Sequence, residues 1–198
     1  MLKFRIISSR MNVLETILNS SRSVFTVQSL MIMTNCNDSE RLTKSLHYYT
    51  DCGKIRNPRR GIYTKLSYDE LEMSCCLFRP SYISLEYVLQ RAGVVFQWDE
   101  SVTCVSYLTR EIEIDNRRYQ FRKINPELWI GTEGIEQQDN IAIATPERAF
   151  LDMVYLSAGN CYFDNLRPLS TSTVRRLLPL YRSQKLGLRV AELLNIKS

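Results

Sequence analysis

Residues suited to metal binding and to cross-linking are scarce in this chain of 198 residues. It contains one histidine, and none of its six cysteines belongs to a CxxC pair. Structural zinc sites need four Cys or His ligands, commonly paired at short spacing, which the adjacent Cys75 and Cys76 do not provide. The sequence therefore predicts no metal site and no disulfide, with reduced cysteines that act as small apolar side chains.

Long apolar segments are missing as well. No run of residues approaches the roughly 18 apolar positions that a membrane-spanning helix needs. The first ten residues, MLKFRIISSR, include basic residues but lack the apolar core of a secretory signal. We expect a cytoplasmic protein without membrane contact, whose translation starts at Met1 or at Met11. A chain of this length can form one or two domains, each with a core of its own.

One group of acidic residues has the pattern of a catalytic metal site. Glu111, Glu113 and Asp115 share one face of a predicted strand, and three carboxylates so placed would suit a nuclease. Arg118 and Arg122 face them across a predicted hairpin. Cross-strand ion pairs therefore account for the same pattern without a metal ion.

Other catalytic motifs are absent from the sequence. The single histidine, His47, has no convincing nucleophile partner for a hydrolytic triad. Residues 131–134 are rich in glycine but lack the lysine and the following helix of a phosphate-binding loop. The sequence thus indicates a protein that is not an enzyme and has no cofactor.

Positive charge is unevenly distributed along the chain. Residues 1–66 hold eleven Lys or Arg and four Asp or Glu, a net charge of +7. Residues 67–198 hold fifteen and seventeen, a net charge of −2. Such asymmetry favours a polyanionic partner for one part of the chain. We therefore predict two domains, 1–66 and 67–198, and assign that partner to the first.

Three helical patterns occur in the basic first domain. A first helix is predicted at 12–19, and Thr26 is a good N-cap for a second. A polar turn at 35–38 leads to a third helix, which begins after Asp38 or Ser39 and buries one apolar stripe. The stripe consists of Leu42, Leu46 and Tyr49. The outer side presents the residues that we predict to contact DNA: Ser39, Arg41, Thr43, Lys44, His47 and Tyr48.

A basic hairpin is predicted directly after these helices. Pro58 suits the second position of a turn, and Gly61 the position after that turn. The cations on its tip and arms are Lys54, Arg56, Arg59, Arg60 and Lys65. Such a hairpin can lie on the phosphate backbone of DNA. With the three helices it predicts a winged helix-turn-helix whose third helix enters the major groove of double-stranded DNA.

Two other interpretations fit the same segment. One is a small helical domain with a solvated basic face. The other is a protein-interaction adaptor module whose winged helix binds protein and not DNA. An exposed apolar patch on the third helix would favour the adaptor, and Arg41, Lys44 and His47 argue against such a patch.

Residues 67–198 are predicted to form a mixed α+β domain with an antiparallel sheet. Helices are expected at 68–78, at 85–92 after a Ser84 cap, at 146–157 after Thr145, after Ser170, and at 188–194. Strands are expected at 102–107, 128–130 and 141–144, with a hairpin of 111–115 and 118–124 around Asn116 and Arg117. Glu147 lies in the first turn of its helix, where it favours the helix dipole, and Asp152 caps or pairs locally. We interpret both as structural, with an interaction role as the alternative.

Three sequence stretches are similar to one known family. They are CGKI with RGIY within 52–63, PSYISLE at 80–86, and IATPERAFLD at 143–152. In their order and spacing, over roughly residues 12–195, they resemble the AbiEi-type antitoxins. That family is the transcription-regulator half of bacterial type IV (abortive-infection) toxin–antitoxin pairs.

The resemblance implies a function for each predicted domain. The winged helix would repress transcription by binding repeats in the protein's own promoter, in the cytoplasm of a bacterium. The second domain would counter a nucleotidyltransferase-like toxin in phage defence, with or without a stable direct complex.

Overall fold

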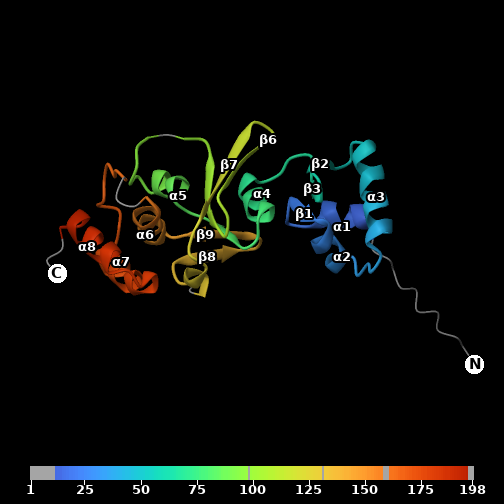
Figure 1. Cartoon of the computed structure of the whole chain (residues 1–198). Helices are drawn as coiled ribbons and strands as arrows, with labels where there is room; N and C mark the ends of the chain where they lie inside the picture. The colour runs from blue at the N-terminus through green and yellow to red at the C-terminus, as the bar shows by residue number, and fades with distance from the viewer. Residues whose placement is uncertain (1–11, 98, 131, 158–160, 196–198) are drawn as a thin grey trace, which may run out of the picture. The chain divides into compact units, whose positions relative to one another are not determined.

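The computed structural model describes residues 12–97, 99–130, 132–157 and 161–195 (Figure 1). These residues form a mixed α+β structure, which confirms the predicted class. The chain divides into two compact units, Met1–Glu72 (unit 1) and Met73–Ser198 (unit 2). We predicted a boundary between residues 66 and 67, whereas it falls inside helix α4 (Glu70–Leu77). The alternative start at Met11 lies outside the described residues.

Glu72 ties the start of α4 to unit 1. Its buried Oε2 accepts hydrogen bonds from the backbone N–H of Ser23 at 2.6 Å and of Val24 at 3.0 Å. The Ser23 hydroxyl donates to the same oxygen at 2.6 Å. A buried carboxylate is tolerated because such donors replace water. This contact joins residues far apart in the sequence, so no local pattern predicts it.

Unit 1 combines helices with a small sheet. The chain runs through α1 (Val13–Asn19), β1 (Val24–Thr26), α2 (Val27–Met33), α3 (Ser39–Asp51), β2 (Arg56–Arg59) and β3 (Ile62–Thr64). The sheet is antiparallel and has the order β1-β3-β2. All three helices and the sheet bury side chains in one core: Ile17, Phe25, Leu30, Leu42, Leu46, Ile55 and Tyr63.

Side-chain caps determine where α2 and α3 begin, as predicted. The Thr26 hydroxyl accepts a hydrogen bond from the backbone N–H of Ser29 at 3.1 Å, and the Ser29 hydroxyl accepts one from the Thr26 N–H at 3.0 Å. Asp38 accepts from the backbone N–H of Arg41 at 2.9 Å. Because each cap satisfies N–H groups that the first helical turn leaves free, both helix starts are encoded locally.

The β2–β3 hairpin turns later than we predicted. Arg59 pairs with Ile62, so the tip is Arg60-Gly61, and Gly61 adopts a φ of +81° that favours glycine. Pro58, predicted at the turn, lies inside β2. β2 is an edge strand of its sheet, where a residue without an N–H is tolerated. The Asn57 side-chain amide braces the turn by donating to the carbonyl of Ile62 at 2.9 Å.

Unit 2 is built on a six-stranded sheet of order β6-β7-β5-β4-β9-β8. Its strands are β4 (Ser81–Ile83), β5 (Val102–Ser106), β6 (Arg110–Ile114), β7 (Arg117–Lys123), β8 (Ile135–Gln138) and β9 (Ile141–Ala144). The predicted antiparallel pairing holds for β4–β5, β6–β7 and β8–β9, but the sheet is mixed, because β5 pairs with β7 and β4 with β9 in parallel. The cause for the β5–β7 pair is topological, since β7 returns from its hairpin with β6 to lie between β6 and β5.

The register of the β6–β7 hairpin differs from our prediction. Asp115 and Asn116 form the two-residue loop with φ of +51° and +63°, as the favoured hairpin turns require. Glu113 therefore pairs with Arg118, and Glu111 with Gln120 instead of Arg122. The strand predicted at 128–130 is part of the 3-10 helix η1 (Pro126–Ile130), and the sequence did not indicate β8.

Helices pack together beside this sheet. They are α5 (Glu86–Arg91), α6 (Pro146–Leu156), α7 (Thr171–Leu177), the 3-10 helix η2 (Leu178–Tyr181) and α8 (Gln184–Leu193). α5, α7 and α8 all contact α6, as Figure 1 shows for α7 and α8 in red. The Thr145 and Ser170 caps are confirmed, whereas α8 begins earlier than predicted, after a Ser183 cap.

The start of helix α5 is stabilised by a residue of strand β5. Ser84 does not cap the helix as predicted, because its hydroxyl donates to Asp152 Oδ2 at 2.8 Å. The Thr103 hydroxyl on β5 accepts from the backbone N–H of Tyr87 at 2.9 Å and donates to the Ser84 carbonyl at 2.7 Å. One hydroxyl from β5 thus replaces a local cap.

Two glycine-to-alanine substitutions should differ in their effect on stability. Gly134 has a φ of +74°, and an added Cβ would lie 3.0 Å from the Cβ of Arg148 and 3.0 Å from a methyl group of Leu177. We expect Gly134→Ala to lower the free energy of unfolding by about 1–3 kcal/mol through strain and overpacking. Gly187→Ala is the matched control, since its Cβ would meet Leu178 at 4.0 Å inside α8.

Chemical denaturation of both variants checks this pair. Gly187→Ala should be neutral or more stable by up to about 1 kcal/mol, because alanine is the better helix former. Equal stability of the two variants would contradict the close packing around Gly134.

Candidate nucleic-acid interface

Helix α3 presents most of its predicted contact residues to solvent. Leu42 and Leu46 face the core of unit 1, which turns the opposite side of the helix outward. The exposed predicted residues are Ser39, Arg41, Lys44, His47 and Tyr48. Thr43 is half-buried, and its hydroxyl donates to the Ser39 carbonyl at 2.7 Å. The helix is therefore positioned to offer its polar side to a partner.

The outward face of α3 is less basic than predicted. Residues at helical spacing, Glu40, Lys44, His47 and Asp51, are all exposed and share that face. Two of these four are carboxylates, which our selection of basic and polar residues left out. The same helical spacing would have identified them from the sequence.

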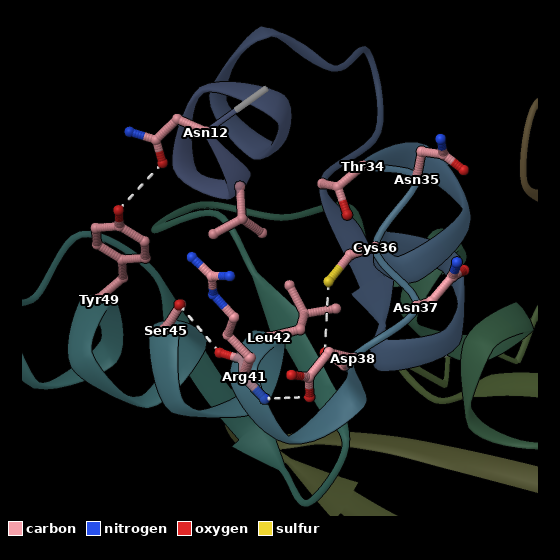
Figure 2. Close-up of a pocket in the computed structure, with 11 residues that line it drawn as sticks. Asn12, Thr34, Asn35, Cys36, Asn37, Asp38, Arg41, Leu42, Ser45 and Tyr49 are labelled. Carbon is pink, nitrogen blue, oxygen red and sulfur yellow. Dashed lines mark hydrogen bonds between the residues drawn. The ribbon is translucent and has the colours of Figure 1, made fainter. Parts of the chain in front are cut away.

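Arg41 projects in a different direction from Lys44. A pocket of about 580 Å³ lies between the start of α1, the α2–α3 turn and α3. Figure 2 shows the Arg41 side chain directed from α3 into this pocket, with Cys36 of the turn on one side. On the other side the Tyr49 hydroxyl donates to Asn12 Oδ1 at 3.1 Å. The two cations predicted on α3 therefore serve different surfaces of unit 1.

The hairpin carries most of the positive charge of unit 1. Residues 54–65 contain five Lys or Arg and no acidic residue, whereas residues 12–53 contain three basic and four acidic residues. Arg60 at the tip and Lys54 before β2 are exposed. Anions should therefore be attracted to the hairpin more than to α3.

The other hairpin cations are partly engaged. Arg56, Arg59 and Lys65 are half-buried. The Lys65 ammonium donates to the carbonyl of Ser20 at 2.7 Å, and the Arg56 guanidinium lies over the Tyr68 ring at 5.9 Å. These contacts anchor the arms of the hairpin and leave Arg60 and Lys54 to extend into solvent.

An aromatic contact joins α3 to the hairpin. The ring of His47 packs edge-on against the ring of Tyr63 on β3, with 6.2 Å between centroids. Tyr63 is buried, and burial raises the pKa of its hydroxyl. The predicted groove-binding helix and the predicted phosphate-binding hairpin are thus held side by side within one unit.

Unit 2 contains a buried polar cluster formed by residues of β4, the segment after it, α6 and η2. Arg148 Nε lies 3.4 Å from Asp152 Oδ1, and both side chains are almost fully buried. Hydroxyl groups donate to the carboxylate from Tyr181 at 2.5 Å, from Ser84 at 2.8 Å and from Tyr82 at 3.0 Å. Burial raises the pKa of the Asp152 carboxyl, and Arg148 and the three hydroxyl donors oppose that rise.

This cluster extends the local pairing predicted for Asp152. The Arg148 guanidinium also donates to the Glu133 carbonyl at 3.2 Å and to the Tyr82 hydroxyl at 3.3 Å. The first-turn Glu147 accepts from the backbone N–H of Ser170 at 3.0 Å, which connects α6 to the start of α7. Both acidic residues of the Thr-Pro-Glu-Arg helix therefore hold separate segments of unit 2 together.

The structure also bears on metal binding, cysteine chemistry and membrane insertion. No group of three His, Cys, Asp or Glu residues in the described part of the chain is placed to hold a metal ion. The six cysteines are free thiols, and burial raises the pKa of Cys75 and Cys104. None of the described helices has the length and apolar character needed to cross a membrane.

Comparisons with known proteins return no match. No protein-family model, no curated protein and no solved structure is significantly similar to this chain.

Proposed function

We propose that unit 1 is a winged helix-turn-helix that binds double-stranded DNA. The observation that carries this proposal is the order of its elements, three helices followed by a hairpin that completes a three-stranded sheet. In that arrangement α3 is the groove-binding helix and β2–β3 is the wing. The hairpin has five cations and no acid, which supports contact with phosphates.

The two elements have different tasks in this proposal. Arg60 and Lys54 on the hairpin hold the phosphate backbone and set orientation without reading sequence. Lys44 and His47 on the outward face of α3 reach the edges of bases in the major groove. Glu40 and Asp51 suit cytosine, whose amino group can donate a hydrogen bond to a carboxylate. The carboxylates on α3 then favour particular sequences, because each would repel a phosphate and need a base donor.

The biological role that we propose is that of a transcriptional repressor and antitoxin. It follows the resemblance of the three sequence stretches to AbiEi-type antitoxins. The protein would bind repeats upstream of its own gene in the bacterial cytoplasm and counter a nucleotidyltransferase-like toxin. Neither unit acts as an enzyme in this proposal. A nucleotidyltransferase-like gene beside its own would support the role.

Fluorescence anisotropy with the full chain tests DNA binding. We expect binding to a duplex from upstream of the gene, with log K falling linearly with log salt by about 0.9 for each phosphate neutralised. An unrelated duplex of equal length should bind more weakly. Its slope of log K against log salt should reflect the number of its phosphates that the protein neutralises.

The same titration separates the two functional classes. Absence of binding at low salt, or an affinity that does not depend on salt, would contradict the proposal and favour the protein-interaction adaptor. Equal affinity for both duplexes would support DNA binding but contradict specific binding to the DNA upstream of the protein's own gene.

A further inference from the structure

The end of unit 2 is a second strongly basic segment. Residues 165–195 contain six Lys or Arg and one acidic residue, whereas residues 73–164 contain eight basic and thirteen acidic residues. A count over residues 67–198 conceals this contrast, because the two parts nearly cancel. The basic part consists of α7, η2, α8 and the chain before them.

Packing of the helices turns these cations outward. In α7, Val174 and Leu177 are buried, which leaves Arg175 and Arg176 exposed on the other side. In α8, Leu186 and Val190 are buried. The basic side chains of the segment that are exposed or half-buried are Arg167, Arg175, Arg176, Arg182, Lys185 and Arg189.

Three arginines of β7 each lie near a carboxylate. Arg117 lies 3.8 Å from Glu100, Arg118 lies 3.9 Å from Asp99, and Arg122 lies 3.4 Å from Glu86. Within the described part of the chain, no basic side chain of residues 165–195 has such an ion-pair partner. Three arginines of β7 therefore have a nearby carboxylate, whereas the described cations of α7 and α8 have none.

We infer that the surface of α7, η2 and α8 is a second binding surface for the phosphate backbone of duplex DNA. Clustered like charges repel one another, and a polyanion relieves that repulsion while its condensed counterions are released. The segment shares with the hairpin of unit 1 an excess of positive over negative charge. The choice of DNA as the polyanion rests on the DNA binding proposed for unit 1.

The test compares matched pairs of charge-neutralising substitutions in the full chain. Arg175→Gln with Arg176→Gln removes two cations from the surface. Arg110→Gln with Lys123→Gln removes two exposed cations from β6 and β7, which lie outside the surface of α7, η2 and α8. Circular dichroism melting should show that both double variants fold as the unmodified protein does.

Anisotropy titrations on a long duplex over a range of salt give the readout. For Arg175→Gln/Arg176→Gln we expect a slope of log K against log salt that is shallower by about 0.9 for each phosphate that the variant no longer neutralises. The Arg110→Gln/Lys123→Gln control should keep the slope of the unmodified protein.

Three outcomes separate this inference from the proposed function. If the unmodified protein binds duplex DNA and both double variants keep its slope, the inference is overturned while DNA binding by unit 1 stands. If the unmodified protein binds no DNA, both proposals are overturned. If Arg175→Gln/Arg176→Gln keeps the slope but abolishes salt-sensitive self-association of the protein, the surface binds the acidic part of a second copy and the inference is wrong.

Discussion

Asp152→Ala is expected to lower the free energy of unfolding by about 3–5 kcal/mol, because it leaves a buried guanidinium without its counter-charge. Arg148 is 1% exposed and Asp152 is 0% exposed, so water cannot replace the missing carboxylate. Three hydroxyl groups, on Tyr181, Ser84 and Tyr82, would lose their acceptor at the same time. Chemical denaturation followed by circular dichroism measures the change.

Glu147→Ala is the matched control for this substitution. Glu147 lies in the same helix and accepts a hydrogen bond from the backbone N–H of Ser170 at 3.0 Å. Its removal should cost about 1 kcal/mol. Asp152→Asn keeps the size of the side chain and one acceptor oxygen but removes the charge. A destabilisation close to that of Asp152→Ala would assign the effect to the ion pair.

The same variants decide between structural and interaction roles for the Thr-Pro-Glu-Arg helix. When the chain is co-expressed with the proposed toxin, we expect Asp152→Ala to lose relief of toxicity only to the extent that the protein unfolds. Failure of rescue at an unchanged melting temperature would overturn the structural interpretation. In that event the carboxylate would take part in function despite its burial.

Lys54→Ala combined with Arg60→Ala is expected to weaken binding to every duplex about equally. Both cations are exposed on a hairpin without acidic residues, so they should bind phosphates. Removal of each charge-assisted hydrogen bond should reduce affinity about tenfold or more. The dependence of log K on log salt should become shallower by about 0.9 for each phosphate released. Anisotropy titrations on the upstream and unrelated duplexes measure both quantities.

Lys44→Ala provides the contrast on α3. Its side chain lies on the outward face of the helix, where removal of a hydrogen bond to a base should change discrimination between sequences by about 1–3 kcal/mol. The unrelated duplex should be affected much less than the upstream duplex. If the hairpin variant altered sequence preference and Lys44→Ala did not, the roles assigned to wing and helix would be reversed.

Local signals in the sequence determined the starts of four predicted helices. Thr26, Asp38, Thr145 and Ser170 each cap the helix that follows, and the structure confirms all four. A cap satisfies N–H groups within three residues of itself, so its whole physical basis is present in a short segment. The apolar stripe of α3 was predictable for the same reason.

The positions of the hairpin turns and the strand registers were predicted less well, because the same residue type can fit more than one position in a hairpin. Pro58 suits a turn but also tolerates an edge strand, and only the pairing of β2 with β3 distinguishes the two. In the β6–β7 hairpin, the positive φ of Asp115 and Asn116 decided the register. Arg122 consequently pairs with Glu86 of α5 and not with Glu111.

The sequence by itself determined the mixed class, the helix caps and the basic hairpin, since each depends on residues close together in the chain. Only the tertiary structure decided which distant groups meet: Glu72 with β1, Thr103 with the start of α5, and Asp152 with hydroxyls of β4 and η2. Buried polar groups need partners wherever the chain can bring them. Those partners came from distant segments, which local spacing does not specify.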